Sequence, residues 1–172
     1  MTRLKLQDPH EMTGKGKALI ETILAKQGKV ANVFKLMANS PAVLEAYLNF
    51  SGALSQGVLN PKLREQIALI VGETNKCEYC LSVHTSIGKG LGLTDEEIMA
   101  ARRGEASDPK IEADIQFAYK LVNQRADIRD EDVATLQRIG YTDEEIAEMV
   151  ANVAMNLFTN YFNHVTNPEI EF

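Results

Sequence analysis

Helix-start signals, spaced along the whole chain, most constrain what this sequence can fold into. Three prolines each follow a residue whose side chain can cap a helix, in Ser40-Pro41, Asn60-Pro61 and Asp108-Pro109. Proline is favoured at the first helical position because an N–H is not needed there, and the preceding side chain can accept a hydrogen bond from a free backbone N–H. Each pair therefore predicts the start of a helix.

Two copies of the tetrapeptide TDEE predict two further helix starts. In each copy a threonine, Thr94 or Thr142, stands three residues before a glutamate, so that the two side chains can cap each other's backbone N–H groups. Helix ends are predicted where the apolar spacing lapses at a glycine, namely at Gly28, Gly57, Gly90, Gly92, Gly104 and Gly140. The predicted helices span about 13–27, 30–39, 41–56, 61–75, 77–90, 94–103, 109–125, 130–139 and 142–164.

These segments leave almost no residues for strands. The run IALIV at 67–71 could form a buried strand, but Leu63, Ile67 and Ile70 keep helical spacing after a proline start, which favours a helix. No linker rich in Ser, Gly or Pro divides the chain. We therefore predict one all-α domain over residues 1–172, with roughly eight or nine helices and no significant sheet.

The charge balance and the first residues bear on partners and location. The chain has 18 Lys and Arg against 24 Asp and Glu, a net charge of −6, which repels nucleic acids and anionic membrane surfaces. No apolar run approaches the roughly 20 residues of a membrane-spanning helix. Charged residues such as Asp8 and Lys15 interrupt the segment in which a secretory signal would lie. We expect a cytoplasmic protein without nucleic-acid or membrane partners.

The two cysteines of the chain, Cys77 and Cys80, stand three residues apart in CEYC. In a reducing compartment such a pair is typical of a redox-active or metal-binding site. On a helix, offsets of three and seven residues place Cys77, Cys80 and His84 on one face. The Cα atoms of such a cysteine pair are about 5 Å apart, within the range of a disulfide. A reversible Cys77–Cys80 disulfide beside a histidine is therefore feasible.

Neighbouring residues could activate the thiols. A thiol reacts as its thiolate, which a helix N-terminus or a nearby base favours. We expect Thr74-Asn75 to cap the helix that begins near Cys77, and His84, one turn after Cys80, to accept its proton. Glu65 lies on a largely apolar face of the preceding predicted helix, where a carboxylate needs a partner, and it is a candidate to orient the imidazole.

Other interpretations of these residues stay open. The cysteines could be two buried apolar side chains, or could bind zinc together with His84 and His164, although such zinc sites usually take their CxxC from a turn. Taken by itself, Glu65 would be a surface partner of Lys62 or Arg64, and without its offset from Cys80, His84 would be a packing residue. His164 is expected to help end the last helix, and His10 to be exposed.

The pattern of Glu65, eleven residues, Cys77-x-x-Cys80, three residues and His84 resembles the AhpD-like alkylhydroperoxidases of the carboxymuconolactone decarboxylase superfamily. The resemblance is strong over about 58–103, which we term the redox module and which follows N-terminal helices at about 1–57. The C-terminal TNYFNHVTNPEIEF also resembles longer members. The resemblance implies an AhpD-like helical domain that assembles into homotrimers or homohexamers.

The resemblance also implies an activity and the role of each site residue. It implies an oxidoreductase acting on peroxides, in which Cys80 attacks the hydroperoxide and Cys77 converts the resulting sulfenic acid into a disulfide. Glu65 and His84 would relay protons. No cofactor is implied, and the dithiol would be restored by a thiol reductant, in the family sometimes a lipoyl-bearing protein.

One residue departs from the family pattern. Tyr79 stands where family members often have a histidine, and a phenol is a poor base at neutral pH. We expect Tyr79 to be a pocket wall or a neighbour of the relay, and peroxidase turnover to be modest. The alternative function is a thiol–disulfide oxidoreductase or redox sensor with incidental peroxidase activity. A muconolactone-type decarboxylase is less favoured because those members lack the CxxC pair, and a zinc-stabilised scaffold is also less favoured.

Overall fold

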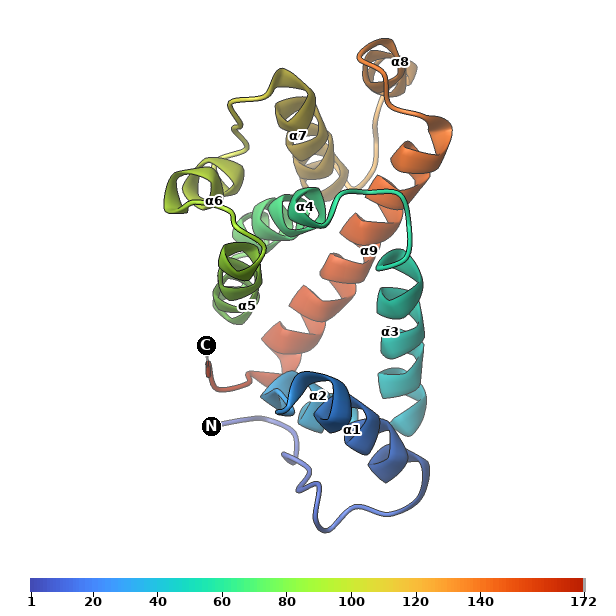
Figure 1. Cartoon of the computed structure of the whole chain (residues 1–172), viewed down its shortest axis with the longest axis vertical. Helices are drawn as coiled ribbons and strands as arrows, with labels where there is room; N and C mark the ends of the chain where they lie inside the picture. The colour runs from blue at the N-terminus through green and yellow to red at the C-terminus, as the bar shows by residue number, and fades with distance from the viewer. Residues whose placement is uncertain (172) are drawn as a thin grey trace.

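The protein is described over residues 1–171 by a computed structural model, and that part of the chain forms nine α-helices and no strand (Figure 1). The helices are α1 (Gly14–Gln27), α2 (Asn32–Met37), α3 (Pro41–Leu54), α4 (Pro61–Thr74), α5 (Glu78–Gly90), α6 (Asp95–Arg102), α7 (Pro109–Asn123), α8 (Asp130–Arg138) and α9 (Asp143–Thr166). The all-α prediction is confirmed, and each predicted helix is present with its ends displaced by no more than about two residues.

The helix starts are made by the side chains that the sequence indicates. Ser40, Asn60 and Asp108 each accept a hydrogen bond from a backbone N–H of the first turn that follows them. Thr94 and Thr142 form complete capping boxes with the glutamates three residues on. These contacts are local, so they fix the helix boundaries without help from the rest of the fold.

Helix α4 is the centre of the larger core. It contacts α5, α6, α7 and α9, and Ile67, Leu69 and Val71 are buried along it. A helix surrounded by other helices is apolar on nearly all sides, which explains why IALIV reads as a continuous apolar run without being a strand.

A smaller apolar core lies among the first three helices. Ile20, Met37 and Leu44 are buried there, one from each of α1, α2 and α3. Helix α3 also packs on α9, which runs across most of the molecule between α3 and the α4–α6 group in the view of Figure 1. The site described next lies where these N-terminal helices meet α5 and α9. No helix formed by residues 1–171 combines the length and apolarity needed to cross a membrane.

Candidate redox site

A tight turn separates α4 from α5 and places the cysteines. Lys76 has a left-handed backbone with φ of 56°, and the N–H of Cys77 donates to the carbonyl of Gly72 at 2.9 Å. This is the pattern of a Schellman helix end, in which a left-handed residue usually is glycine. Cys77 is the N-cap of α5, and its Sγ accepts from the N–H of Cys80 at 3.3 Å.

The prediction that Thr74-Asn75 caps α5 is wrong. The hydroxyl of Thr74 donates back to the carbonyl of Ile70, and the amide of Asn75 donates to Asn160 on α9. Both residues belong to the end of α4, because the left-handed turn at Lys76 stands between them and α5. A cysteine sulfur takes the capping position instead.

Cys77 and Cys80 form a disulfide. Their Cα atoms are 5.3 Å apart, which confirms the spacing expected for an i, i+3 pair. Only 2% of Cys77 and 3% of Cys80 is exposed, so both cysteines are buried. The pair can therefore change between dithiol and disulfide with little movement of the backbone.

Glu65 and His84 form the second part of the site. Glu65 Oε2 lies 2.7 Å from His84 Nδ1, joining α4 to α5, and only 15% and 19% of the two side chains is exposed. An ionised carboxylate can only accept, so Nδ1 donates and Nε2 is left as the basic nitrogen. The surface pairing considered for Glu65 does not occur: Lys62 donates to the carbonyl of Gly92, and Arg64 to that of Leu54.

Two asparagines complete the surroundings of Cys80. Asn160 and Asn163 donate to its Sγ, at 3.1 and 3.4 Å, from the buried face of α9. The Oδ1 of Asn160 accepts from the amide of Asn75 at 3.0 Å, which fixes the direction of its N–H groups. Hydrogen bonds of this kind favour an anionic sulfur over a neutral one.

The asparagines were missed by the sequence analysis, although a signal is present. Asparagines stand at Asn152, Asn156, Asn160 and Asn163, which is helical spacing, and all are buried. A row of buried amides on one face of an otherwise apolar helix needs hydrogen-bonding partners. The row indicates a polar site, but not which distant residue it would contact.

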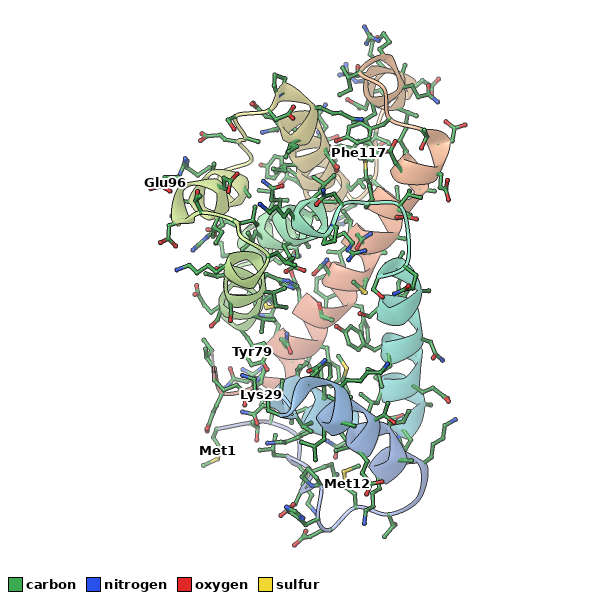
Figure 2. The ribbon with its side chains drawn as sticks, viewed as in Figure 1. Met1, Met12, Lys29, Tyr79, Glu96 and Phe117 are labelled. Carbon is green, nitrogen blue, oxygen red and sulfur yellow. A yellow bond between two sulfur atoms is a disulfide. The ribbon has the colours of Figure 1, made fainter. Side chains whose placement is uncertain are left out.

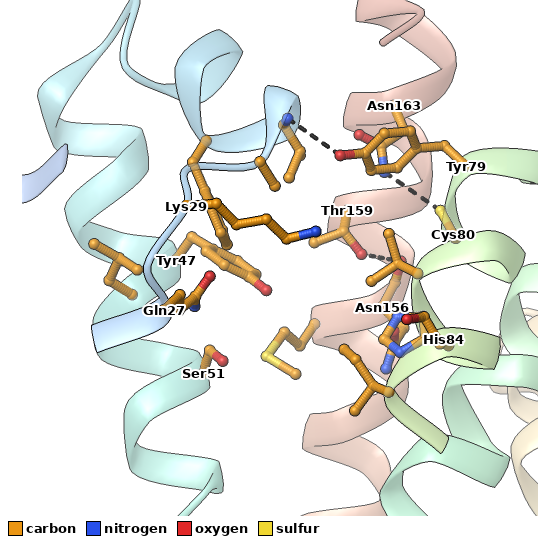
Figure 3. A pocket seen from close by; sticks show the side chains of 18 residues that line it. Gln27, Lys29, Tyr47, Ser51, Tyr79, Cys80, His84, Asn156, Thr159 and Asn163 are labelled. Carbon is orange, nitrogen blue, oxygen red and sulfur yellow. Dashed lines mark hydrogen bonds between the residues drawn. The ribbon is translucent and has the colours of Figure 1, made fainter. Parts of the chain in front are cut away.

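A cavity of about 510 Å³ lies between α5, α9 and the N-terminal helices, and both Cys80 and His84 line it (Figure 3). Apolar and aromatic side chains supply much of the remaining wall, namely Ala31, Val33, Phe34, Tyr47, Leu48, Tyr79, Val83, Ile87 and Met155. In Figure 3, Tyr47 and Ser51 face Cys80 and His84 from across the cavity. Burial raises the pKa of Tyr47, which keeps its phenol neutral.

Tyr79 lies at the junction between α5 and the N-terminal helices (Figure 2). Its hydroxyl accepts from the N–H of Val33 at 3.4 Å and donates to Glu171 at 3.1 Å. Burial, and to a smaller extent the charge of Glu171, raises the pKa of Tyr79 far above its usual value, while the N–H of Val33 opposes that rise. Tyr79 is thus a neutral wall of the cavity that also holds the C-terminal segment.

The other two histidines, His10 and His164, make no hydrogen bond to either cysteine sulfur in the described part of the chain. His164 Nε2 is 2.8 Å from the carbonyl of Asn75, and α9 continues past it to Thr166, with Asn167 as a left-handed cap. His164 is therefore in the last turn, as expected, but Asn167 ends the helix. His10 is exposed, as predicted. Among residues 1–171 no group of three or more His, Cys, Asp and Glu side chains is arranged to hold a metal ion.

Comparison with known proteins finds similarity in the central part of the chain. Residues 41–118, which include Glu65, Cys77, Cys80 and His84, match the model of the carboxymuconolactone decarboxylase family. This segment is therefore similar to the carboxymuconolactone decarboxylase family. A Haemophilus influenzae protein described as uncharacterized is 47% identical over 45 residues, which is 26% of this chain and 40% of that protein.

Solved structures share the fold well beyond this family segment. The alkylhydroperoxidase AhpD core from Ralstonia eutropha JMP134, an uncharacterized peroxidase-related protein, has a TM-score of 0.87 at 22% identity, over 99% of this chain and 92% of that one. A peroxidase-related protein from Silicibacter sp. TM1040 has a TM-score of 0.86 at 24% identity, over 98% and 90%. The debrominase Bmp8 in complex with 2,3,4-tribromopyrrole has 0.77 at 21% identity, over 90% and 84%. These likenesses confirm the AhpD-like fold.

Proposed function

We propose that the protein is a thiol-dependent peroxidase that reduces hydroperoxides through a Cys77–Cys80 dithiol/disulfide cycle. One observation carries the proposal: Cys80, one half of a disulfide, lines the same cavity as His84, whose imidazole is oriented by Glu65 at 2.7 Å. A nucleophile, a base and a group that orients the base are the parts that activated thiols require.

The oxidative step begins from the dithiol. His84 Nε2 takes the proton of Cys80, and the amides of Asn160 and Asn163 stabilise the resulting thiolate. The thiolate attacks the terminal oxygen of the hydroperoxide, so that an S–O bond forms as the O–O bond breaks. The leaving alkoxide takes the proton held by His84. Cys80 is now a sulfenic acid, and the hydroperoxide has become an alcohol.

The second step closes the disulfide. The Cys77 thiolate attacks the Cys80 sulfur, the S–S bond forms, and hydroxide leaves as water after taking the remaining thiol proton. The 5.3 Å separation of the Cα atoms lets this occur within one turn of α5. A dithiol reductant then returns both cysteines to thiols, giving a balanced reaction of hydroperoxide and dithiol to alcohol, water and disulfide.

The wall of the cavity bears on the substrate. A volume of about 510 Å³ with apolar and aromatic lining exceeds what hydrogen peroxide needs and fits an organic hydroperoxide. Polar side chains line both sides of the cavity, with Gln27, Lys29 and Ser51 across from Cys80 and His84. The O–O group would lie beside Cys80 and His84. We propose an alkyl or aryl hydroperoxide as the substrate class.

Partners and setting form part of the same proposal. The reductant is a thiol, with a lipoyl-bearing protein as one candidate, and the cytoplasm supplies the reducing conditions in which the disulfide can cycle. Val150, Phe158, Tyr161 and Val165 are exposed on α9, and we propose that subunits of a homotrimer or homohexamer cover them. Light scattering of the purified chain gives the subunit number, and a monomer at micromolar concentration would contradict this assembly.

The activity is tested by peroxide consumption with cumene hydroperoxide and excess dithiothreitol. We expect Cys80→Ser to abolish consumption, and Cys77→Ser to accumulate a sulfenic acid that dimedone traps. Equal consumption by wild type and Cys80→Ser would end the proposal. Faster turnover with a disulfide substrate than with any hydroperoxide would instead favour the thiol–disulfide oxidoreductase, which uses the same cysteine pair.

A further inference from the structure

We propose that the oxidised protein is reduced from the side of Cys77, in a cleft separate from the hydroperoxide cavity, by a thiol that carries a negative charge. The proposal rests on the proposed peroxidase function. The cleft has a volume of about 240 Å³ and is lined by Cys77 but not by Cys80, whereas the larger cavity is lined by Cys80 but not by Cys77. Cys77 thus lines one cavity and Cys80 the other, and Tyr79 and Asn163 line both.

The chemistry of disulfide exchange sets the side of attack. A thiolate approaches a disulfide sulfur along the line of the S–S bond, from the side away from the leaving sulfur. A thiolate in the cleft beside Cys77 therefore attacks Cys77 Sγ, a new S–S bond forms, and Cys80 leaves as a thiolate. A second thiol then attacks the outer sulfur of the mixed disulfide, releases Cys77 as a thiolate and departs as the oxidised disulfide.

The hydrogen bonds favour Cys80 as the leaving group. Its sulfur already receives two amide N–H groups, from Asn160 and Asn163, whereas Cys77 Sγ receives the single backbone N–H of Cys80. Exchange is faster when the leaving thiolate is better stabilised. The same two amides that assist peroxide attack therefore direct the reductant to Cys77.

The charges of the cleft select an anionic thiol. Arg3 and Lys76 both line it, and the guanidinium of Arg3 is held in place by a hydrogen bond of 2.8 Å to the carbonyl of His164. Glu78 is the carboxylate among the lining residues, so the two cations exceed it. A negatively charged thiol is thereby concentrated at Cys77, by an attraction that salt screens.

A lysine, Lys76, stands at a position where the backbone conformation favours glycine. It occupies the left-handed position of the turn, with φ of 56°, and directly precedes Cys77. Glycine would adopt this conformation at no steric cost. Strain that persists beside a reactive group points to a role for the side chain, here a cation at the cleft.

The test measures reduction alone. Protein oxidised with diamide, so that no peroxidase activity is needed, is reduced by 2-mercaptoethanesulfonate, which is anionic, or by 2-mercaptoethanol, which is neutral. We expect Lys76→Gln and Lys76→Gly each to lower the rate of disulfide reduction by the anionic thiol about threefold at low salt. The rate of reduction by the neutral thiol and the rate of oxidation by hydroperoxide should not change. Lys76→Arg should retain the wild-type rate, and Lys17→Gln, the same charge change on α1, should have no effect.

Two further readouts separate charge from structure and locate the attack. Lys76→Gly should unfold at the same or a higher temperature than wild type, because it relieves the turn, yet reduce as slowly as Lys76→Gln. Peptide mapping after acid quenching should place the mercaptoethanesulfonate adduct on Cys77. An adduct on Cys80 would overturn the proposal that the thiol attacks from the cleft beside Cys77. Equal effects of the Lys76 substitutions on the reduction rates with both thiols would overturn it as well. If the disulfide is reduced by the two thiols as expected but the protein does not reduce hydroperoxides, the peroxidase proposal is overturned and the cleft proposal is not.

Discussion

Glu65 and Asp114 are two acidic side chains set inside the same helical domain, and their surroundings differ in one respect. Glu65 has an imidazole at 2.7 Å. Asp114, on α7, is 0% exposed, and within residues 1–171 neither of its carboxylate oxygens has a hydrogen-bond partner. Burial raises the pKa of Asp114 to about 7, and the nearby Tyr141 and Lys110 only partly oppose that rise.

The comparison teaches what a buried carboxylate needs in order to act. A paired carboxylate can stay charged and can hold a histidine in one tautomer. A proton relay requires a histidine that is held in this way. A buried carboxylate without a partner is driven toward its neutral form and weakens the fold at neutral pH instead. The three predictions that follow would break or sharpen this contrast.

The largest effect is expected for the partner of Glu65. His84→Ala removes the base, and we expect the rate at which hydroperoxide oxidises Cys80 to fall by about 10²- to 10⁴-fold. Stopped-flow measurement of single-turnover oxidation gives this rate without any contribution from the reductant. His10→Ala, at an exposed site, is the control. A loss of less than about threefold in His84→Ala would mean that the imidazole is not the base.

A smaller loss is expected for Glu65→Gln. The amide keeps the size of the side chain and can still accept from His84 Nδ1, but it removes the negative charge, so we expect a loss of about 10- to 100-fold in the same rate. The matched change in the other region, Asp114→Asn, should leave the rate unaltered. Equal losses in the two variants would show that the contrast between the two carboxylates has no functional meaning.

The last effect is one of stability and not of rate, and it should appear only for Asp114. Its pKa is about 7 in the folded protein against about 3.8 when unfolded, so the folded state binds the proton more tightly. The free energy of unfolding should therefore decrease as pH rises from about 4 to about 7, by up to about 4 kcal/mol, and then stay level. Urea titrations at pH 5 and pH 8 should show about 3 kcal/mol of this loss in wild type and none of it in Asp114→Asn.

A partly buried aspartate, paired with Lys120 at 2.6 Å, supplies the control of opposite sign. The pKa of Asp132 is lowered, first by its hydrogen bond from Lys120 and then by the backbone N–H of Arg129. Its contribution is therefore present above the unfolded pKa and is lost as pH falls. If the free energies of unfolding of Asp114→Asn and wild type differ by the same amount at both pH values, the side chain of Asp114 is not neutralised by burial.

The parts of the molecule that the sequence predicted are those set by local contacts. Helix boundaries follow from caps such as Ser40 and Thr94, whose partners lie within one turn. Local rules suffice for these boundaries. The contact of Glu65 with His84 was predicted because the spacing from Glu65 to His84 resembles the AhpD-like pattern, whereas the residues alone favoured a surface pairing for Glu65.

Other features depend on how distant helices pack. Asn160 reaches Cys80 across a sequence separation of 80 residues, so its role requires knowing where α9 lies relative to α5. The same holds for Asp114, whose lack of a partner arises from the packing around α7. The cap prediction at Thr74-Asn75 was wrong because Lys76 adopts a left-handed conformation that lysine seldom takes.

The proposed cycle is tested most directly by the intact mass of the fully reduced chain before and after one equivalent of cumene hydroperoxide. The account predicts a loss of two hydrogen atoms, located at Cys77 and Cys80, and full recovery of the original mass with a dithiol. An unchanged mass, or a gain of oxygen on Cys80 that never converts to the disulfide, would contradict it.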